Sequence, residues 1–461
     1  MQRTFAIAWL TWKAAFRFRL FLVLVVLLLA AVVGLPLVIK DDGTARGFTQ
    51  ILLTYTLSAI TGLLGISTLW LACGTLARDI EECQIQIVAA KPIARWQIWM
   101  GKWLGLLSLN AALLAISGVA VFGLLQWRAT KLPAAEQARL RNEVLVARGA
   151  AKERSWEAEI DTATEQVLAK RLKTSPVSGA DLAEVRRQIR EQVKAAWQIV
   201  QPGENRIWRI DLGRAWESLR DRPLQLRVKF NAAQNNPSGT FAALWQIGEP
   251  ESPKLRQLEP MSLAPNTFHE FEIPANLCDD KGVLTILFVN PNDSALLFPL
   301  EDGMEVLYRE GGFWQNFARG LGIIFCWMAL LAAIGLAAAS ELSFPVAAFF
   351  SLAVLTVGLS SGTMASVVQS GTIAGMDEES GVVGHSVIDA LALPFFKGVL
   401  TVINLVKSFS PIDSLSSGRS ITWGELGAAF AQIVLLLGGL FAVAGITLFN
   451  RRELAAAQGT Q

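Results

Sequence analysis

Long apolar stretches recur along the chain, and each is long enough to form a membrane-spanning helix. A helix needs about 20 apolar residues to cross the hydrocarbon core of a bilayer. Six stretches meet this length, at residues 20–39, 51–76, 103–125, 321–339, 344–368 and 428–449. The pattern predicts six transmembrane helices, with a polar segment between the third and the fourth.

The positions of Lys and Arg predict the orientation of these helices, because positive residues stay on the cytoplasmic side of short loops. Ten of them lie before the first stretch, between the second and third, and after the sixth: Arg3, Lys13, Arg17, Arg19, Arg78, Lys91, Arg95, Lys102, Arg451 and Arg452. Residues 40–46 hold two positive charges that Asp41 and Asp42 balance. We therefore expect cytoplasmic termini, with 127–313 and 369–427 outside.

A seventh apolar stretch lies at 387–409, but it contains polar residues that a full crossing would bury. These are Asp389, Lys397, Asn404 and Lys407. Charged side chains are expensive inside a bilayer, and a seventh crossing would also move the C-terminal arginines outside. We expect the loop 369–427 to hold a re-entrant or interfacial helix that ends near Pro411.

The N-terminal segment has the pattern of an amphipathic helix, because Phe5, Trp9, Trp12 and Phe16 recur at helical spacing beside Lys13. Such a helix lies in the membrane interface with its basic face toward lipid headgroups. The alternative is a plain continuation of the first span into the cytosol. Tryptophans near the predicted span ends agree with an interfacial belt: Trp9, Trp12, Trp70, Trp103, Trp127, Trp314 and Trp423.

Charge is concentrated in residues 127–313, which hold 25 of the 41 Lys and Arg and 26 of the 39 Asp and Glu. Over the whole chain 17% of residues are charged, below the value of about 25% for soluble domains. This distribution excludes an ordinary soluble protein and a disordered one. The net charge of +2 gives no general attraction to nucleic acid.

The polar segment divides in two by its periodicity. Residues 134–200 carry apolar residues at helical spacing, which predicts a helical hairpin that covers its own domain or, alternatively, binds a partner. Residues 205–310 hold short alternating runs between Pro-, Asn- and Gly-rich turns, which predicts a jelly-roll-like antiparallel β-sandwich. Trp208, Trp216 and Trp245 could stack on a carbohydrate-like ligand or belong to the core.

The predicted fold is therefore an α-helical membrane protein with six transmembrane helices and an extracytoplasmic insert of a helical hairpin and a β-sandwich. The predicted domains are 1–126, with the N-terminal helix, helices one to three and a cytoplasmic loop 77–102; 127–204, the hairpin; 205–313, the sandwich; and 314–461, helices four to six with the re-entrant loop.

The sequence carries no motif for nucleotide binding or catalysis. Gly101-Lys102 lacks the preceding glycine loop that cradles phosphates. The two histidines, His269 and His385, have no metal-ligand spacing, and we expect no metal, cofactor or catalytic residue. Carboxylates are absent at mid-depth in the spans, so an ion gradient is not the expected energy source.

The stretch 77–105 reads ARDIEECQIQIVAAKPIARWQIWMGKWLG. It resembles the loop between spans two and three of type-2 ABC exporter permeases, closest in look to those of nitrous-oxide-reductase maturation and gliding motility. The family pattern of an acid, a short helix, Pro-x-x-Arg and Gly-Lys-x-x-Gly falls on Glu81 or Glu82, Ile87-Val88, Pro92 with Arg95, and Gly101, Lys102 and Gly105. The family's frequent Gly-Thr after the acid is replaced by Cys83-Gln84. The N-terminal helix resembles the family's elbow helix.

This resemblance implies a permease subunit in a bacterial inner membrane that works with a cytoplasmic ATPase and a second permease chain. ATP and magnesium would be bound by the ATPase. The loop 77–102 would receive the mechanical work, and its candidate residues are Arg78, Asp79, Glu81, Glu82, Lys91, Pro92, Arg95 and Lys102. We expect the acids near a helix start, where the helix dipole favours them. A generic positive-inside loop is the alternative.

Two further expectations concern partners. Small residues in the second span, Gly62, Gly65 and Ser67, could let two permease chains approach closely. The chain could instead be a membrane-anchored scaffold or binding protein that acts through its extracytoplasmic domain; an enzyme is the third and weakest interpretation.

Cysteine labelling of intact cells tests the predicted orientation. Cysteines introduced at Ala150 and Pro250 should react with a reagent that does not cross membranes, because the Lys and Arg distribution places residues 127–313 outside. Labelling of both positions only after the cells are permeabilised would contradict the six-span arrangement.

Overall fold

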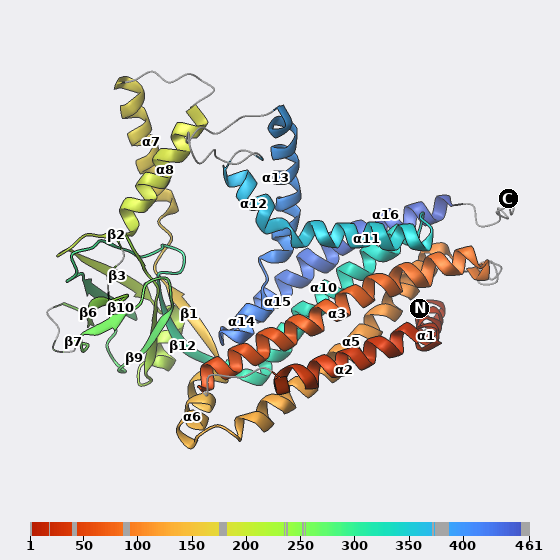
Figure 1. The fold of residues 1–461 in the computed structure, drawn as a ribbon, viewed down its shortest axis with the longest axis horizontal. Coiled ribbons are helices and arrows are strands. Elements are labelled where there is room, and N and C mark those ends of the chain that lie inside the picture. Colours follow the sequence, from red (N-terminus) through yellow and green to blue (C-terminus); the bar gives the residue numbers. More distant parts are fainter. Residues whose placement is uncertain are drawn as a thin grey trace. The chain divides into compact units, whose positions relative to one another are not determined.

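The structure, a computed structural model, describes residues 2–17, 19–38, 44–85, 93–174, 182–234, 236, 238–250, 253, 255–370, 373 and 387–452. It divides into two compact units, a helical unit of Met1–Ala147 with Gly311–Gln461 and a mixed unit of Arg148–Glu310 (Figure 1). The predicted insert began at 127, whereas the helical unit continues through the end of α5 and the short α6.

The helical unit is built from long apolar helices and shorter connecting ones. They are α1 (Gln2–Arg17), α2 (Arg19–Val38), α3 (Ala45–Glu81), α5 (Arg95–Ala129), α6 (Ala134–Arg139), η1 (Leu140–Val144), α10 (Phe313–Ala339), α11 (Phe344–Leu359), α12 (Ser361–Ser370), α13 (Val387–Lys407), α14 (Pro411–Ser416), α15 (Trp423–Ala429), η3 (Phe430–Gly438) and α16 (Gly439–Arg451). The helices α15, η3 and α16 follow one another without a break.

Five helical stretches among the described residues are long and apolar enough to cross a membrane: Gly47–Glu81, Arg95–Ala129, Phe313–Ala339, Leu391–Ser416 and Trp423–Arg451. The helices α11 and α12 bend by 51° at their junction and make a sixth if they count as one span. This composition is that of a helical membrane protein. The count of six crossings stays a prediction, because α2 contributes only a shorter apolar stretch, Val23–Leu35, to the part that the structure describes.

The stretch Leu391–Ser416 is long and apolar enough for a full crossing, so the re-entrant or interfacial placement stays a prediction, while its helix α13 ends at Lys407, close to the expected end near Pro411. Asp389, one of the polar residues that made a crossing unfavourable in the sequence analysis, lies outside this stretch. Asp389 is buried near the start of α13, where its carboxylate accepts a hydrogen bond from the backbone N–H of Ile373 at 3.0 Å. The sequence pattern alone could not reveal that partner.

Helix α10 is the central helix of this unit, because it packs against α3, α5, α11 and α16. Small residues allow the close approach. A Cβ atom on Gly335 of α10 would lie 2.7 Å from the Cβ atom of Ala72 in α3, and one on Gly445 of α16 would lie 2.9 Å from the Cα atom of Ala337. The helices therefore meet nearly backbone to backbone.

The small residues proposed for a second permease chain are mostly used inside the unit. Gly65 packs against Leu331 of α10, with 3.3 Å from its Cβ position to the Cδ1 atom. Ser67 is buried and donates a hydrogen bond to the carbonyl of Leu64. Only Gly62 faces open space among the three. Gly65 and Ser67 are therefore engaged within the chain, and the close approach of a second chain at this helix stays a prediction.

Two long helices, two short helical turns and several antiparallel sheets make up the described part of the mixed unit. Its helices are α7 (Glu157–Thr174), α8 (Leu182–Gln198), η2 (Gly213–Ala215) and α9 (Trp216–Leu219). Its strands are β1 (Val146–Lys152), β2 (Ile199–Val200), β3 (Asn205–Asp211), β4 (Leu224–Val228), β5 (Asn231–Ala232), β6 (Phe241–Ile247), β7 (Arg256–Gln257), β8 (Met261–Leu263), β9 (His269–Ile273), β10 (Val283–Val289), β11 (Leu296–Leu297) and β12 (Met304–Gly312). The strand β1 falls where we expected helix.

Two sheets, in the order β1-β12-β4-β9 and β3-β10-β6-β7, share one apolar core. The alternation of apolar residues in the sequence produces this core, because every second side chain of a strand points to the same face. Leu226 and Val228 of β4 and Trp245 and Ile247 of β6 all point inward and are fully buried. A third sheet has the order β2-β11-β5. The prediction of antiparallel β-structure in this part of the chain is confirmed.

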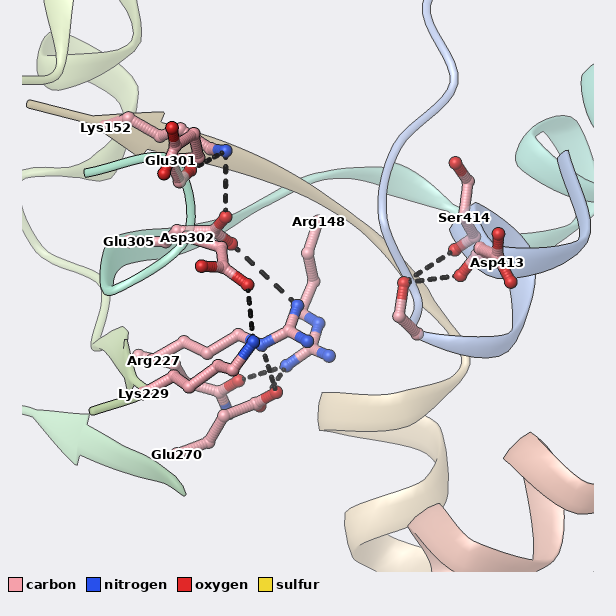
Figure 2. A network of polar contacts seen from close by, with 12 residues as sticks. Arg148, Lys152, Arg227, Lys229, Glu270, Glu301, Asp302, Glu305, Asp413 and Ser414 are labelled. Carbon is pink, nitrogen blue, oxygen red and sulfur yellow. Dashed lines mark hydrogen bonds and ion pairs between the residues drawn. The ribbon is translucent and has the colours of Figure 1, made fainter. Parts of the chain in front are cut away.

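The opposite face of the first sheet carries a ladder of charges (Figure 2). The strand register places Arg227 of β4 directly opposite Glu305 of β12 on one side and Glu270 of β9 on the other. Both carboxylates lie 3.8 Å from the Arg227 guanidinium, and Arg148 of β1 reaches Glu270 at 2.8 Å. A slip of one residue would turn these charges into the core, so the ladder fixes the register.

The helices α7 and α8 form the predicted hairpin and pack on each other. Trp156 and Trp197 meet with 4.9 Å between ring centroids. Arg190 of α8 pairs with Asp161 of α7 at 2.9 Å, and Lys194 pairs with Glu301 at 2.6 Å. The second contact attaches the hairpin to the β-structure. These contacts favour the interpretation in which the hairpin covers its own domain.

Candidate functional site

The predicted coupling loop joins the C-terminal end of α3 to the N-terminal end of α5, at the end of the helical unit where α10 and α16 also terminate and α11 begins (Figure 1). Arg78, Asp79 and Glu81 lie in the last turn of α3, and Glu82 is its C-cap. Arg95 is the first residue of α5. Lys91 and Pro92 lie outside the described residues.

Lys102 is the most buried charged residue of this site, at 6% exposure. Its ammonium donates to the carboxylate of Asp79 at 2.5 Å and to the carbonyl of Thr75 at 2.6 Å. A buried charge is costly unless it is paired and hydrogen-bonded, and both conditions hold here. The pair connects the last turn of α3 to α5 at a point seven residues after α5 begins.

Asp79 and Glu81 lie in the last turn of α3 and Glu82 is its C-cap, and helical residues resume directly after them at Gln84 and Ile85. The rest of that second helical segment lies outside the described residues, so the expected interaction of the acids with a helix start stays a prediction. The carboxylate of Glu81 accepts a hydrogen bond from the backbone N–H of Phe344, 2.8 Å away, at the first residue of α11. Helix N-termini favour a carboxylate. Arg78 stacks on the same residue, with 4.4 Å from its guanidinium to the Phe344 ring.

Arg95 connects α5 to the C-terminal end of α16. Its guanidinium donates to the carbonyls of Phe449, Asn450 and Arg452 at 2.8, 2.9 and 2.8 Å. These carbonyls are left without partners when a helix ends. Arg452 in turn donates to the carbonyl of Ser340, the C-cap of α10.

The glycines of Gly-Lys-x-x-Gly hold the N-terminal helix. A Cβ atom on Gly101 would lie 2.7 Å from the Cβ atom of Ile7, and one on Gly105 would lie 2.7 Å from the Cβ atom of Thr11. Only glycine allows α1 to approach α5 so closely. The indole N–H of Trp12 adds a hydrogen bond to the hydroxyl of Ser108 at 2.7 Å. The motif positions α1 against α5 for a purely steric reason.

Cys83 adopts a left-handed backbone conformation, with φ of 58°, directly after α3. This is where helices usually place glycine. For a residue with a Cβ atom this conformation costs roughly 1–2 kcal/mol.

The described residues of the site include exposed ones on both sides of the loop. Glu81, Glu82, Cys83 and Gln84 are exposed, and the Gln84 amide donates to the Glu82 carboxylate at 2.6 Å. Trp96, which the sequence reasoning passed over, is 50% exposed in the first turn of α5. Its only signal in the sequence is an indole next to the motif arginine. Aromatic residues of this kind commonly anchor protein partners.

Of the three tryptophans that could stack on a ligand or belong to the core, two belong to the core. Trp208 and Trp245 are buried at 2% and 0% exposure in the core that the two sheets share, and the half-buried Trp216 of α9 packs beside Gly282. A cleft of ≈ 210 Å³ lies elsewhere in the mixed unit, lined by residues that include Lys152, Trp156, Lys194 and Glu301.

The charges of this cleft are already engaged. Lys194 donates to the carboxylate of Glu301 and holds the pKa of that carboxyl below its usual range. Arg154 lies over the Trp156 ring at 4.4 Å, so that face of the indole is covered. Within the described residues, no three His, Cys, Asp or Glu side chains come together as metal ligands.

The chain has no detected relatives. No protein-family model matches it, and neither the curated proteins nor the solved structures contain a significant match. Function must therefore be argued from the geometry of this site.

A matched pair of glycine substitutions in α5 tests whether the close packing of α1 on α5 stabilises the protein. Gly105→Ala should destabilise the protein by about 1–3 kcal/mol, because the added methyl group meets Thr11 and the Ala8 carbonyl. Gly123→Ala, in the same helix but with open space around it, should be neutral or stabilising by up to about 1 kcal/mol. The measurement is thermal unfolding in mild detergent.

Thiol labelling distinguishes local detachment of α1 from α5 from a loss of stability of the whole protein. Ala15 is fully buried on α1, so a cysteine there should be protected in the wild type and in the Gly123→Ala background. It should become reactive in the Gly105→Ala background. Equal protection in both backgrounds would show that these contacts do not hold α1.

Proposed function

We propose that the chain is the permease subunit of an ABC transporter, which couples ATP hydrolysis in a separate ATPase to export or to mechanical work on the extracytoplasmic side. The chain itself supplies no catalytic residue. ATP and magnesium belong to the ATPase. The membrane would be the bacterial inner membrane, with the mixed unit outside it.

The observation that carries this proposal is the set of polar contacts around the α3–α5 loop. Asp79 with Lys102 connects α3 to α5, Glu81 connects α3 to α11, and Arg95 connects α5 to α16. Arg452 extends the series to α10. A displacement of the loop would thus be transmitted to the ends of five helices, as coupling to a cytoplasmic ATPase requires.

The loop has the features of a protein contact. It presents the exposed Glu82 and Trp96 beside rigidly held helix ends. Charged residues at an interface set register and specificity more than affinity, and an exposed Trp can supply the affinity. A second permease chain would complete the transport pathway, and of the three small residues only Gly62 offers it open space.

The alternative proposal is a membrane-anchored scaffold or binding protein that acts through its extracytoplasmic domain. The observation that favours it is the independence of the mixed unit, which has its own core and its own cleft. This function needs no ATPase, so an ATPase that co-purifies with the chain discriminates between the two proposals.

Charge reversal at Glu82 tests the ATPase contact. Glu82→Lys should reduce ATPase co-purification from membranes by about tenfold, equivalent to about 1.4 kcal/mol, because the residue is exposed at the loop. Glu81 is unsuitable, since its carboxylate caps α11 and reversal would also disturb the fold.

Glu310→Lys is the matched control, because Glu310 is also exposed and is expected on the opposite side of the membrane. It should leave the ATPase contact unchanged. If Glu82→Lys retains the ATPase as well as Glu310→Lys does, with the same coupled activity, Glu82 is not part of the contact.

A further inference from the structure

Arg319 of α10 is a buried cation that has no counterion among the described residues. The residue is 8% exposed, although it lies in a helix long and apolar enough to cross a membrane. Its Nε–H donates to the carbonyl of Gln315, one turn earlier in the same helix, at 3.1 Å. The remaining guanidinium N–H groups have no hydrogen-bond partner among the residues that the structure describes.

The free end of this guanidinium faces outward. Its two terminal nitrogens are not among the enclosed polar atoms that lack a partner, so the small exposed fraction of the residue lies at that end. No described carboxylate pairs with it. A cation that is mostly removed from water and unpaired is strongly unfavourable, so the arrangement calls for an anion from outside the chain.

One exposed tryptophan lies against Arg319 and a second lies nearby along the same helix. The Arg319 guanidinium lies 5.5 Å from the centre of the Trp423 ring, and Trp423 is 71% exposed at the start of α15. Trp314, 54% exposed, lies five residues earlier on α10, which is about 7.5 Å along the helix axis. Tryptophans of this kind mark the level of lipid headgroups.

We propose that Arg319 and Trp423 bind the phosphate of a phospholipid headgroup at this end of the helical unit. Guanidinium groups bind phosphate oxygens through two parallel hydrogen bonds. The Trp423 ring covers the guanidinium and orients it by a cation–π contact. The proposal depends on the membrane placement of α10 and α15 and is independent of any ATPase.

Native mass spectrometry of the full-length protein in mild detergent with added phosphatidylglycerol tests the site. Arg319→Gln should raise the apparent dissociation constant of the tightest bound lipid by about tenfold or more, the change expected from losing a charge-assisted hydrogen-bond pair. Trp423→Leu should weaken binding by a smaller factor. Arg309→Gln is the control, since it removes the same charge from an exposed position in the mixed unit.

Three results would overturn the proposal: equal lipid retention by Arg319→Gln and Arg309→Gln, an equal loss in both, or saturation of the site by inorganic phosphate at the concentrations at which the lipid binds. If Arg319→Gln does not survive purification, Arg319→Lys replaces it. A lysine keeps the charge but not the two parallel bonds, so its affinity for the lipid should fall several-fold, and wild-type affinity would contradict the site.

Discussion

The arrangement of the helical unit depends on how charges are accommodated at the ends of apolar helices. A helix that ends leaves carbonyls or N–H groups without partners, and a charged side chain beside it must be paired if it is buried. In this unit the charged side chains supply partners for the helix ends and for one another. Lys102 pairs with Asp79, Glu81 accepts a hydrogen bond from the first N–H of α11, and Arg95 donates to the last carbonyls of α16. The same contacts fix the base of the α3–α5 loop.

The sequence predicted the helical elements well, because a run of about 20 apolar residues has few alternatives to a long helix. Strand alternation likewise located the antiparallel sheets. The partners of the site residues could not be predicted, since Glu81 meets Phe344, 263 positions along the chain. A helical segment does follow the acids at Gln84, but the described partner of Glu81 is the first N–H of a different helix, α11. The sequence also left open whether Trp208 and Trp245 bind a ligand or belong to the core. They belong to the core, and the pattern of a single strand does not show which of its faces a second sheet covers.

The two units would have different roles in the proposed function. The helical unit holds the candidate coupling loop and helices that can move together. The mixed unit has a core of its own and a charge ladder that permits only one strand register. Removing one member of such a buried pair costs roughly 3–5 kcal/mol, so the ladder makes this unit a rigid body on which mechanical work could be delivered.

Hydrogen exchange of the Arg95→Gln variant tests most directly whether the loop and the helix ends form one connected body. Charged hydrogen bonds contribute about 1.5–3 kcal/mol, so their loss should speed exchange by about tenfold or more in the last turn of α16 and, through Arg452, at the end of α10. These segments are more than 200 residues from the substitution in sequence. Faster exchange confined to the first turn of α5, with α16 and α10 unchanged, would contradict the connection.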